Sequence, residues 1–295
     1  MTSDLAGKLF RIAAAAATVG LAACVHAAAE TVPLGQIMAM RAGISMLLIL
    51  AYGLATVPAR TLLPRRWRPH LARGALACVA MTLTYIAFAR LPVTQAQTLI
   101  YLAPVLVVPF AIWRLGERFR VSTAIALALG CSGVALILGL TFEAGRYAFV
   151  GAVAGLGAAI LIAVIQVAIR AMTATESTLS IALSFTVIVL GVMSFTALAG
   201  NWVLPQGVAL WALVGAGVFG ALNLVCLAEA LARAPAATLA PLDYTGLVWA
   251  LLADWLLFSQ VPGPLGVLGS ILITAAALVV VLRRARPVVV PPAAP

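Results

Sequence analysis

The stretch AFARLPVTQAQTLIYLAPV (residues 87–105) recurs in weaker form as ALARAPAATLAPLDYTGLV (residues 230–248). Both stretches contain an Arg-x-Pro break followed by a tyrosine, and the two tyrosines are 143 positions apart. At this offset the identical pairs are Ala87 and Ala230, Ala89 and Ala232, Arg90 and Arg233, Pro92 and Pro235, Leu99 and Leu242, Tyr101 and Tyr244, and Val105 and Val248. An alanine-rich chain aligns with itself by chance at many offsets, but paired breaks and paired tyrosines are harder to obtain in that way. The repeat therefore predicts two structurally related halves.

The composition around this repeat is that of a membrane protein. Of the 295 residues, 64% are hydrophobic and 9% are charged, and the mean hydropathy is +1.16, whereas soluble domains are roughly 45–50% apolar. The apolar runs last about 20 residues, the length of a helix that crosses ~30 Å of hydrocarbon. A water-soluble fold is excluded. The net charge of +10 does not indicate a nucleic-acid partner, because the basic residues are spread thinly between apolar runs.

Charged residues and Pro or Gly breaks divide the chain into ten predicted transmembrane helices. These cover residues 8–29, 34–56, 71–90, 93–113, 121–141, 148–170, 178–199, 207–231, 235–258 and 264–282. The first five form a predicted repeat at 8–141 and the last five a second at 148–283, followed by a disordered cytoplasmic tail at 284–295. Because five is an odd number, the second half enters the membrane from the opposite side. The predicted fold is an all-α membrane bundle of two inverted five-helix repeats, which is typical of secondary transporters.

Basic residues predict the orientation of this bundle. Fifteen of the 18 Lys and Arg residues, including Lys8, Arg11 and Arg73, fall on the side of the termini, against Arg90 and Arg146 on the other side. By the positive-inside rule, both termini are cytoplasmic and the chain is a multi-pass protein of a bacterial-type inner membrane. The N-terminal segment imitates a secretory signal peptide. Its counterpart in the second half is a mid-chain helix, so we expect it to be retained as the first helix.

Polar residues line one face of the predicted helix 93–113. Thr94, Gln97, Thr98, Tyr101 and Pro104 follow one another at helical spacing on an otherwise apolar cylinder. Unpaired polar groups are costly in lipid, so this stripe should face the bundle interior or a wet cavity. Hydrogen bonding between helices, without any ligand, would explain it equally well. Together with its repeat partner Tyr244, Tyr101 predicts a pair of tyrosines near the middle of the membrane that could bind a metabolite with apolar and polar parts.

Arg41 is the only basic residue that we place well inside a span. Burying a guanidinium at a helix centre costs roughly 2.5–3.5 kcal/mol on insertion scales, so something should offset it. A carboxylate or phosphate on the substrate would do so. So would a structural pair with Asp243 or Asp254, or snorkelling toward the nearby outer surface.

Asp243 is the deepest acidic residue, and it precedes the repeat-related Tyr244. It is a candidate for proton coupling or for binding a substrate amine, and the alternative is a structural pair with Arg41 or a tyrosine hydroxyl. Tyr85 and Asn223 are further candidates for substrate contact within spans. Each of these alone is more often a packing hydrogen bond than a ligand contact.

The sequence favours neither catalysis nor a cofactor. The four cysteines form no close pair, the two histidines, His26 and His70, are far apart, and no Walker A loop is present. No paired carboxylates share a helix face, so an intramembrane enzyme is not expected. We predict no metal and no cofactor, with a small-molecule substrate and membrane lipid as the partners; the sequence does not indicate the oligomeric state.

The pattern resembles the EamA family of the drug/metabolite transporter superfamily over residues 8–283. The residues that carry the resemblance are Arg41 after Pro33-Leu34-Gly35-Gln36, the turn Ala89-Arg90-Leu91-Pro92, Tyr101 through Pro104, and above all Leu115-Gly116-Glu117-Arg118. The second half departs from the pattern, because Ser259-Gln260 stands where Gly-Glu is expected and Ser184 stands opposite Arg41. Any role of the Gly-Glu pair therefore applies to the first half only. There Glu117 lies among arginines and would neutralise them.

The resemblance implies ten spans and transport of a small organic metabolite by alternating access. Members similar to this chain export amino acids and related metabolites, or take up riboflavin or S-adenosylmethionine. We expect an exporter of amino acids or amino-acid-derived zwitterions, with uptake of a riboflavin-like or S-adenosylmethionine-like metabolite as the alternative. A membrane assembly subunit that transports nothing is the alternative from a different class. It predicts no cavity lined by Gln97, Tyr101 and Tyr244.

Overall fold

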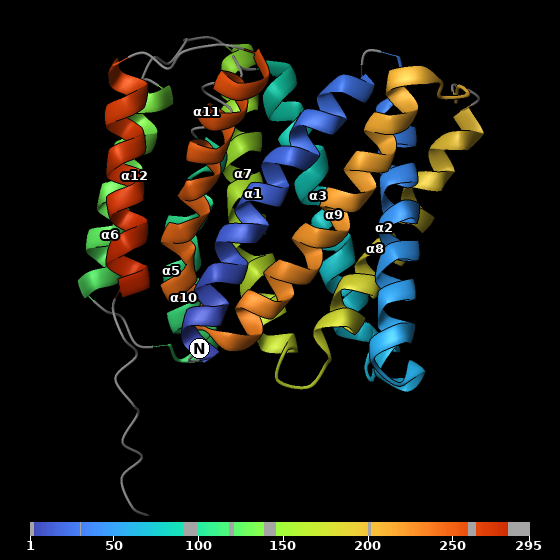
Figure 1. The fold of residues 1–295 in the computed structure, drawn as a ribbon, viewed down its shortest axis with the longest axis horizontal. Coiled ribbons are helices and arrows are strands. Elements are labelled where there is room, and N and C mark those ends of the chain that lie inside the picture. Colours follow the sequence, from blue (N-terminus) through green and yellow to red (C-terminus); the bar gives the residue numbers. More distant parts are fainter. Residues whose placement is uncertain are drawn as a thin grey trace, which may run out of the picture.

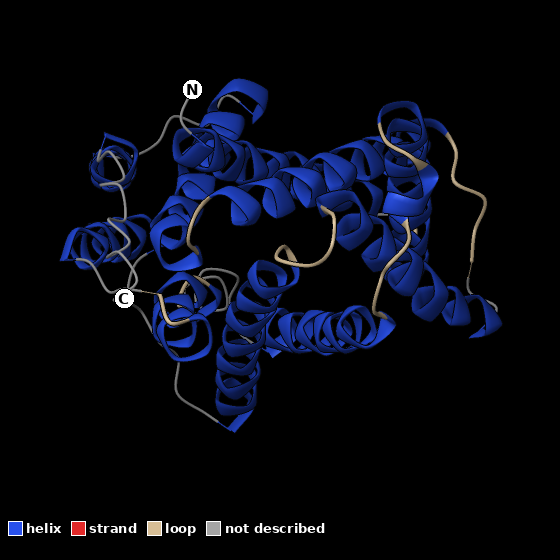
Figure 2. Ribbon diagram, turned by 90° about the horizontal axis from the view of Figure 1, so that it is seen from below, coloured by secondary structure: helices blue, strands red, loops and turns tan. Residues whose placement is uncertain are grey.

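The structure is a computed structural model in which every regular element of the described chain is a helix (Figures 1 and 2). The described residues are 3–29, 31–90, 99–117, 121–138, 146–199, 202–258 and 264–282. The α-helices are α1 (Ser3–Ala29), α2 (Leu34–Thr56), α3 (Trp67–Arg90), α5 (Ala103–Leu115), α6 (Val121–Leu138), α7 (Arg146–Met172), α8 (Thr178–Ser194), α9 (Gly207–Arg233), α10 (Ala236–Leu239), α11 (Thr245–Phe258) and α12 (Pro264–Leu282). Short 3₁₀ helices are η1 (Ala59–Leu62), η2 (Phe195–Ala199) and η3 (Ala240–Tyr244).

The helices of the described residues overlap the predicted spans, although residues 93–98 of the fourth span lie outside the described residues. The bounds of α2 and α12 are those predicted, and α1, α3, α7 and α9 extend the predicted spans by a few residues. Within the described residues, five helices are long and apolar enough to cross a bilayer by length and composition, and three shorter helices are also apolar. The predicted tail at 284–295 lies outside the described residues.

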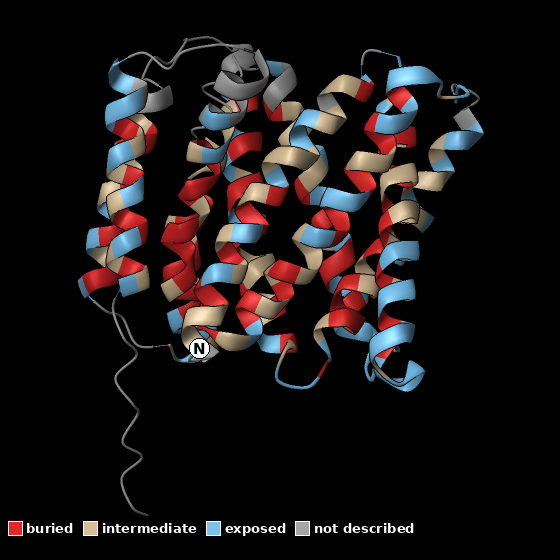
Figure 3. Ribbon diagram, in the orientation of Figure 1, coloured by how far each residue is buried: buried red, intermediate tan, exposed pale blue. Residues whose placement is uncertain are grey.

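Much of the outer surface is apolar, as a lipid-facing surface must be. Trp113 is 80% exposed, Leu198 82% and Leu204 81%, whereas soluble monomers rarely expose large continuous apolar patches. Figure 3 shows buried residues gathered where the helices face one another and exposed residues on the outer helix faces. Because each helix satisfies its own backbone hydrogen bonds, such a surface is stable in hydrocarbon.

Helices from the two predicted halves pack mainly on each other. α1 packs on α9, α3 on α7, α6 on α12, α2 on α8 and α9, and α5 on α7. Figure 1 shows α6 and α12 side by side at one flank and α2 and α8 at the other. The centre of the bundle is therefore built from residues on both sides of the predicted division.

Glycines allow several of these close approaches. A Cβ at Gly217 of α9 would lie 2.3 Å from Cγ2 of Ile44 on α2, and one at Gly155 of α7 would lie 3.0 Å from Leu99. The small residues in α7 and α9 thus serve helix packing.

The fourth and ninth predicted spans are both interrupted. In the fourth, helical residues 99–100 lead into a turn at residues 101–102 before α5 begins. In the ninth, one turn of α10 leads into the 3₁₀ segment η3, and α11 follows. Tyr101 lies in the first interruption and Tyr244 ends the second, so the repeat-related tyrosines mark the same position in both spans. Pro104 and Pro241 lie at or beside these interruptions, where a missing N–H is tolerated.

The Gly-Glu pair joins two helices at the C-terminal end of α5. Gly116 adopts a left-handed conformation (φ 65°) that ends α5, and its N–H donates to Ile112 O. The carboxylate of Glu117 then accepts hydrogen bonds from the backbone N–H groups of Ala236 and Ala237, at 2.9 Å each. Glu117 therefore caps the start of α10, where free N–H groups and the helix dipole favour a negative charge. Glu117 also lies 3.9 Å from Nε of Arg170 in an ion pair. The expectation that it neutralises the arginines next to it in sequence is not tested, because Arg118 and Arg120 lie outside the described residues.

Candidate functional site

Two cavities lie between the helices at the centre of the bundle. The larger, of about 310 Å³, is lined by Arg11, Tyr101, Gln166, Asn223 and Asp243 among others, and we call it the tyrosine cavity. The smaller, of about 220 Å³, is lined by Arg41, Arg73, Phe185, Gln166 and Asn223 among others, and we call it the arginine cavity. The two cavities share the wall residues Ile162, Gln166, Asn223 and Leu227.

Asp243 lies in the tyrosine cavity and is bound by Arg11 of α1. Nη2 of Arg11 donates to Oδ2 of Asp243 at 2.5 Å, and Nε lies against Oδ1 in an ion pair that lacks hydrogen-bond geometry. The Arg11 side chain is 3% exposed and that of Asp243 is 20% exposed. The ionic pair thus balances its own charge inside the bundle.

Gln166 of α7 completes this cluster. Its Oε1 accepts from Nη2 of Arg11 at 2.6 Å, and its Nε2 donates to Oδ2 of Asp243 at 3.2 Å. Three elements, α1, α7 and η3, are joined by one polar network. Because Gln166 lines both cavities, a change in this network can reach the arginine cavity.

Asn223 of α9 lies between the cavities. Its Nδ2 donates to Ala14 O at 3.0 Å and to Oγ1 of Thr18 at 2.8 Å, both on α1. Asn223 also lines both cavities. Asn223 therefore holds α9 against α1 and also lies where a ligand contact is expected.

The predicted tyrosine pair is close in space but not equivalent in environment. The ring centroids of Tyr101 and Tyr244 are 6.1 Å apart, tilted by 45°. Tyr101 lines the tyrosine cavity, whereas Tyr244 is fully buried (0% exposed) and lines neither cavity. The Tyr244 hydroxyl lies 3.1 Å from Cys131 Sγ, and its ring packs against Gly130 of α6. The structure places Tyr244 as support behind Tyr101.

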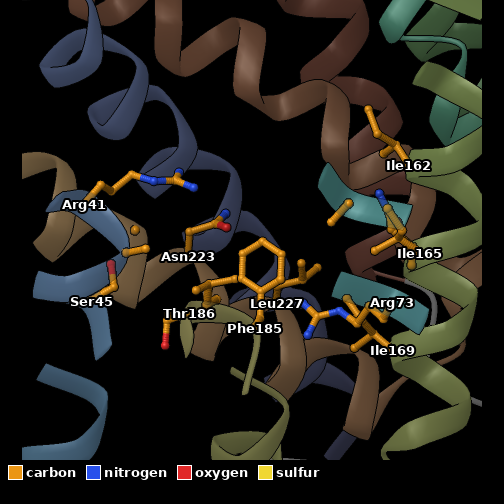
Figure 4. A pocket seen from close by; sticks show the side chains of 15 residues that line it. Arg41, Ser45, Arg73, Ile162, Ile165, Ile169, Phe185, Thr186, Asn223 and Leu227 are labelled. Atoms are coloured by element: carbon orange, nitrogen blue, oxygen red, sulfur yellow. The ribbon is translucent and has the colours of Figure 1, made fainter. Parts of the chain in front are cut away.

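Arg41 lines the arginine cavity, as expected of a residue that faces the bundle interior. Its aliphatic stem passes Gly220 of α9, where an added Cβ would lie 3.6 Å from Arg41 Cγ. Figure 4 shows the side chain of Arg41 reaching across above Asn223, with the Phe185 ring between Arg41 and Arg73. Ser45, one turn after Arg41 on α2, donates to Gly217 O at 2.7 Å and fixes α2 on α9.

The prediction that Arg41 is the only basic residue well inside a span is wrong. Arg11 and Arg73, which the sequence analysis assigned to the cytoplasmic surface, are 3% and 4% exposed and line the cavities. Of the two proposed structural partners of Arg41, Asp243 pairs with Arg11 instead, and the side chain of Asp254 lies outside the described residues. Asp243 pairs with Arg11 because α1 brings the guanidinium group of Arg11 to the same depth in the bundle as the carboxylate of Asp243.

Other predicted site residues cannot be placed. Gln97 and Thr98, with Thr94, lie outside the described residues, and so does the side chain of Tyr85. Of the eight candidates, Arg41, Tyr101, Asn223 and Asp243 line a cavity. Gln166 and Arg73 join them, although the sequence analysis did not single them out for binding.

With this geometry established, comparison with known proteins identifies the class. The model of the EamA-like transporter family matches residues 5–139 and again residues 149–282. The chain belongs to the EamA-like transporter family, a family of multi-pass membrane transporters and not of enzymes.

Individual relatives cover most of the chain. It is 31% identical over 285 residues to the pseudopaline exporter CntI of Pseudomonas aeruginosa (strain UCBPP-PA14), covering 94% of this chain and 97% of the relative. It is 29% identical to a riboflavin transporter of Rhizobium johnstonii (75% and 72% covered) and 27% identical to an S-adenosylmethionine uptake transporter of Rickettsia felis (72% and 71% covered). A solved crystal structure with a TM-score of 0.83 and 21% identity covers 94% of this chain and 96% of its own length, and shows the same fold.

Proposed function

We propose that this protein exports amino acids or amino-acid-derived zwitterions across a bacterial inner membrane by alternating access. The observation that carries the proposal is the pair of central cavities, each lined by polar residues from both predicted halves. Secondary transporters place their substrate sites at such a position between repeats. The similarity to an exporter over nearly the whole chain supports the direction.

In this proposal the cavity residues contact the substrate. Arg41 binds a substrate carboxylate through paired N–H donors. Asn223 offers an amide to polar groups of the substrate, and Tyr101 offers an aromatic face and a hydroxyl. Asp243 binds a substrate amine or couples protons at the moment when its bond to Arg11 opens. Gln97, Thr98 and Tyr85 remain proposed substrate contacts on the sequence pattern alone, and Tyr244 holds Tyr101 in place.

The interrupted spans supply the moving parts. Each interruption leaves backbone groups outside regular α-helical bonding, so the chain can bend there at lower cost than within a continuous helix. We propose that the units 8–141 and 148–283 are inverted halves that rock about the cavities, with the bends at Tyr101 and at η3. Ten spans and two cytoplasmic termini follow from this arrangement. They can be tested with single cysteines at positions 60 and 207, labelled from inside and outside of intact cells.

The function is tested by comparing cells with and without the gene. Export predicts that loss of the gene raises one or more intracellular amino-acid-derived metabolites and lowers them in the medium. Purified protein in liposomes should then exchange the same metabolite, and an Asn223→Ala variant should exchange it more slowly. Accumulation that requires the gene would instead favour uptake of a riboflavin-like or S-adenosylmethionine-like compound. A folded protein that moves no metabolite under any gradient would leave the assembly subunit as the explanation.

A further inference from the structure

The connection between α2 and α3 carries a dense group of exposed basic residues. We call residues 59–68 the basic turn; it contains η1 and the first two residues of α3. No acidic residue lies within it, and no salt bridge joins its arginines to any other described residue. The exposed basic residues of the turn are Arg60, Arg65, Arg66 and Arg68. The basic turn thus presents four guanidinium groups to its surroundings.

The backbone of the basic turn is fixed, although its arginine side chains are exposed. The two carboxylate oxygens of Glu176, just before α8, accept from the backbone N–H groups of Arg65 and Arg66 at 3.0 and 3.1 Å. Oγ of Ser177 donates to Thr61 O at 2.6 Å. The carboxylate of Glu176 therefore holds the turn by its backbone and leaves the guanidinium groups outside. A surface that is already ordered loses little entropy when it binds a partner.

Apolar side chains beside the arginines are also exposed. Leu62 is 3% exposed and anchors the turn in the core, whereas Leu63 is 64% exposed and Trp67 is 51% exposed. Leu71, one turn after Trp67 on α3, is 53% exposed. Tryptophan is enriched where hydrocarbon meets the lipid headgroups, and arginine extends its charge from apolar surface toward water at the same level. The side chains of the basic turn are thus those of a membrane interface.

The lengths of the two flanking helices place the basic turn at the height of the headgroups. α2 has 23 residues and α3 has 24, so each is about 35 Å long and exceeds the ~30 Å hydrocarbon layer. Figure 1 shows the end of α2 that leads into the turn at the same end of the bundle as the N-terminus, and Figure 3 shows exposed residues there. The sequence analysis predicts this end to be cytoplasmic.

We propose that the basic turn binds the headgroup of an anionic phospholipid in the leaflet on the side of the termini, with the acyl chains against Leu63, Trp67 and Leu71. Basic clusters directly beside a transmembrane helix attract anionic lipid, and each basic residue near the surface strengthens binding about fivefold. The inference does not depend on what the protein transports. If the arginines served only to orient the chain during insertion, the folded protein would not distinguish between lipids.

The test measures lipid binding to the purified, delipidated full chain by native mass spectrometry in detergent. Dioleoyl-phosphatidylglycerol is compared with dioleoyl-phosphatidylcholine, which has the same acyl chains but no net charge on its headgroup. We expect the anionic lipid to bind at least about tenfold more tightly at low salt. The preference should weaken as salt is added, because exposed charges are screened.

Two triple variants locate the preference. Replacing Arg65, Arg66 and Arg68 together by glutamine should remove most of it, and replacing the same three by lysine should keep most of it, because the charge remains. The matched control replaces Arg283, Arg284 and Arg286 by glutamine, which removes the same number of charges from a segment that the sequence analysis assigns to the same side. This control should keep the preference.

Each outcome decides the inference. Equal binding of the two lipids by the unaltered protein overturns it, and so does an equal loss of preference in both glutamine triple variants, because net charge alone would then explain the binding. A preference that excess inorganic phosphate abolishes at constant ionic strength would indicate a site for free anions and would also overturn it. If the first triple variant does not fold, Arg66→Gln and Arg68→Gln are compared with Arg284→Gln instead. Transport is not the readout, so the proposed function can fail while this inference stands.

Discussion

Asp243 of η3 is held by Arg11 of α1 through a 2.5 Å hydrogen bond and an ion pair. The two residues are 232 positions apart in the chain and belong to different predicted halves. The contact therefore ties the interrupted ninth span to the first helix, beside the tyrosine cavity. A residue that was a candidate for proton coupling is also part of the framework that holds the site together.

Neutralising one partner of this pair should destabilise the protein. Asp243→Asn leaves Arg11 buried without its counter-charge, and breaking a buried ion pair in this way costs about 3 kcal/mol. The double variant Arg11→Gln/Asp243→Asn should recover much of this loss, because no isolated charge remains. Unfolding in detergent, followed for the two single variants and the double variant, measures the coupling energy.

The three variants of Arg11 and Asp243 form a double-mutant cycle, and a second cycle, with Arg41 in place of Arg11, serves as its control. Arg41→Gln combined with Asp243→Asn should give additive losses of stability, because Arg11 and not Arg41 binds Asp243. Additivity in the Arg11 cycle and coupling in the Arg41 cycle would contradict the pairing described above.

The Arg11/Asp243 double variant also separates a role of Asp243 in proton coupling from its role in stability. If Asp243 carries the coupled proton, liposomes with the folded double variant should still exchange substrate across the membrane but should not accumulate it in response to a pH gradient. Exchange needs no net proton release, whereas accumulation does. Concentrative transport that remains fully pH-driven in this variant would show that protons are coupled elsewhere or not at all.

Helix positions could be predicted from the sequence because hydrocarbon imposes a nearly fixed span length. The apolar run 34–56 has the bounds of α2, and 264–282 those of α12. The interruption at Tyr101 and the segment η3 could not be read in the same way, since apolar composition continues through both. The paired tyrosines, with Pro104 and Pro241 beside them, pointed to these positions. They did not reveal that Tyr244 faces α6 and not the cavity.

The partner of Asp243 could have been found from depth. Arg11 follows the start of α1 by eight residues, and Asp243 follows the start of α10 by seven. At 1.5 Å per residue, both lie roughly 10–12 Å from the N-terminal ends of their helices, on the side of the bundle where α1 begins. Arg41 lies about 10 Å from the opposite end, by the same rise. The sequence analysis placed Arg11 at the surface because it counted basic residues on each side of the membrane. It did not consider how far each residue lies from the end of its helix.

Packing glycines between α6 and α12 offer a test of the bundle. A Cβ at Gly133 would lie 2.7 Å from the carbonyl oxygen of Gly269 and 2.7 Å from Ile273 Cγ1. Backbone cannot move aside as a flexible side chain can, so Gly133→Ala should destabilise the protein by about 1–3 kcal/mol. Gly191→Ala is the matched control in α8, because an added Cβ there meets nothing within 4 Å.

For the control, alanine in place of glycine in a helix interior should stabilise the fold by roughly 0.5–1 kcal/mol. The two variants should therefore shift the unfolding temperature in detergent in opposite directions. A loss of stability of the same size in both would mean that the α6–α12 contact is not as close as described.

The Gly-Glu pair at the end of α5 should act through the start of α10. Because Gly116 has φ 65° and an added Cβ meets nothing within 4 Å, Gly116→Ala should cost about 1 kcal/mol through backbone strain alone, and Gly116→Asn should cost less. Glu117→Gln keeps the size of the side chain but removes the charge that accepts from Ala236 and Ala237, so it should cost about 1–2 kcal/mol.

Hydrogen exchange locates the effect of Glu117. The amides of Ala236 and Ala237 are bound to its carboxylate, so Glu117→Gln should speed exchange in a peptide that covers residues 233–240. Peptides from α8, which Glu117 does not touch, should exchange as before. The alternative is that the carboxylate of Glu117 only neutralises the arginines near it in sequence. Hydrogen exchange at Ala236 and Ala237 would then stay unchanged in Glu117→Gln, and the stability of the unaltered protein would vary with salt. Surface charge interactions are screened over about 10 Å at 0.1 M ionic strength.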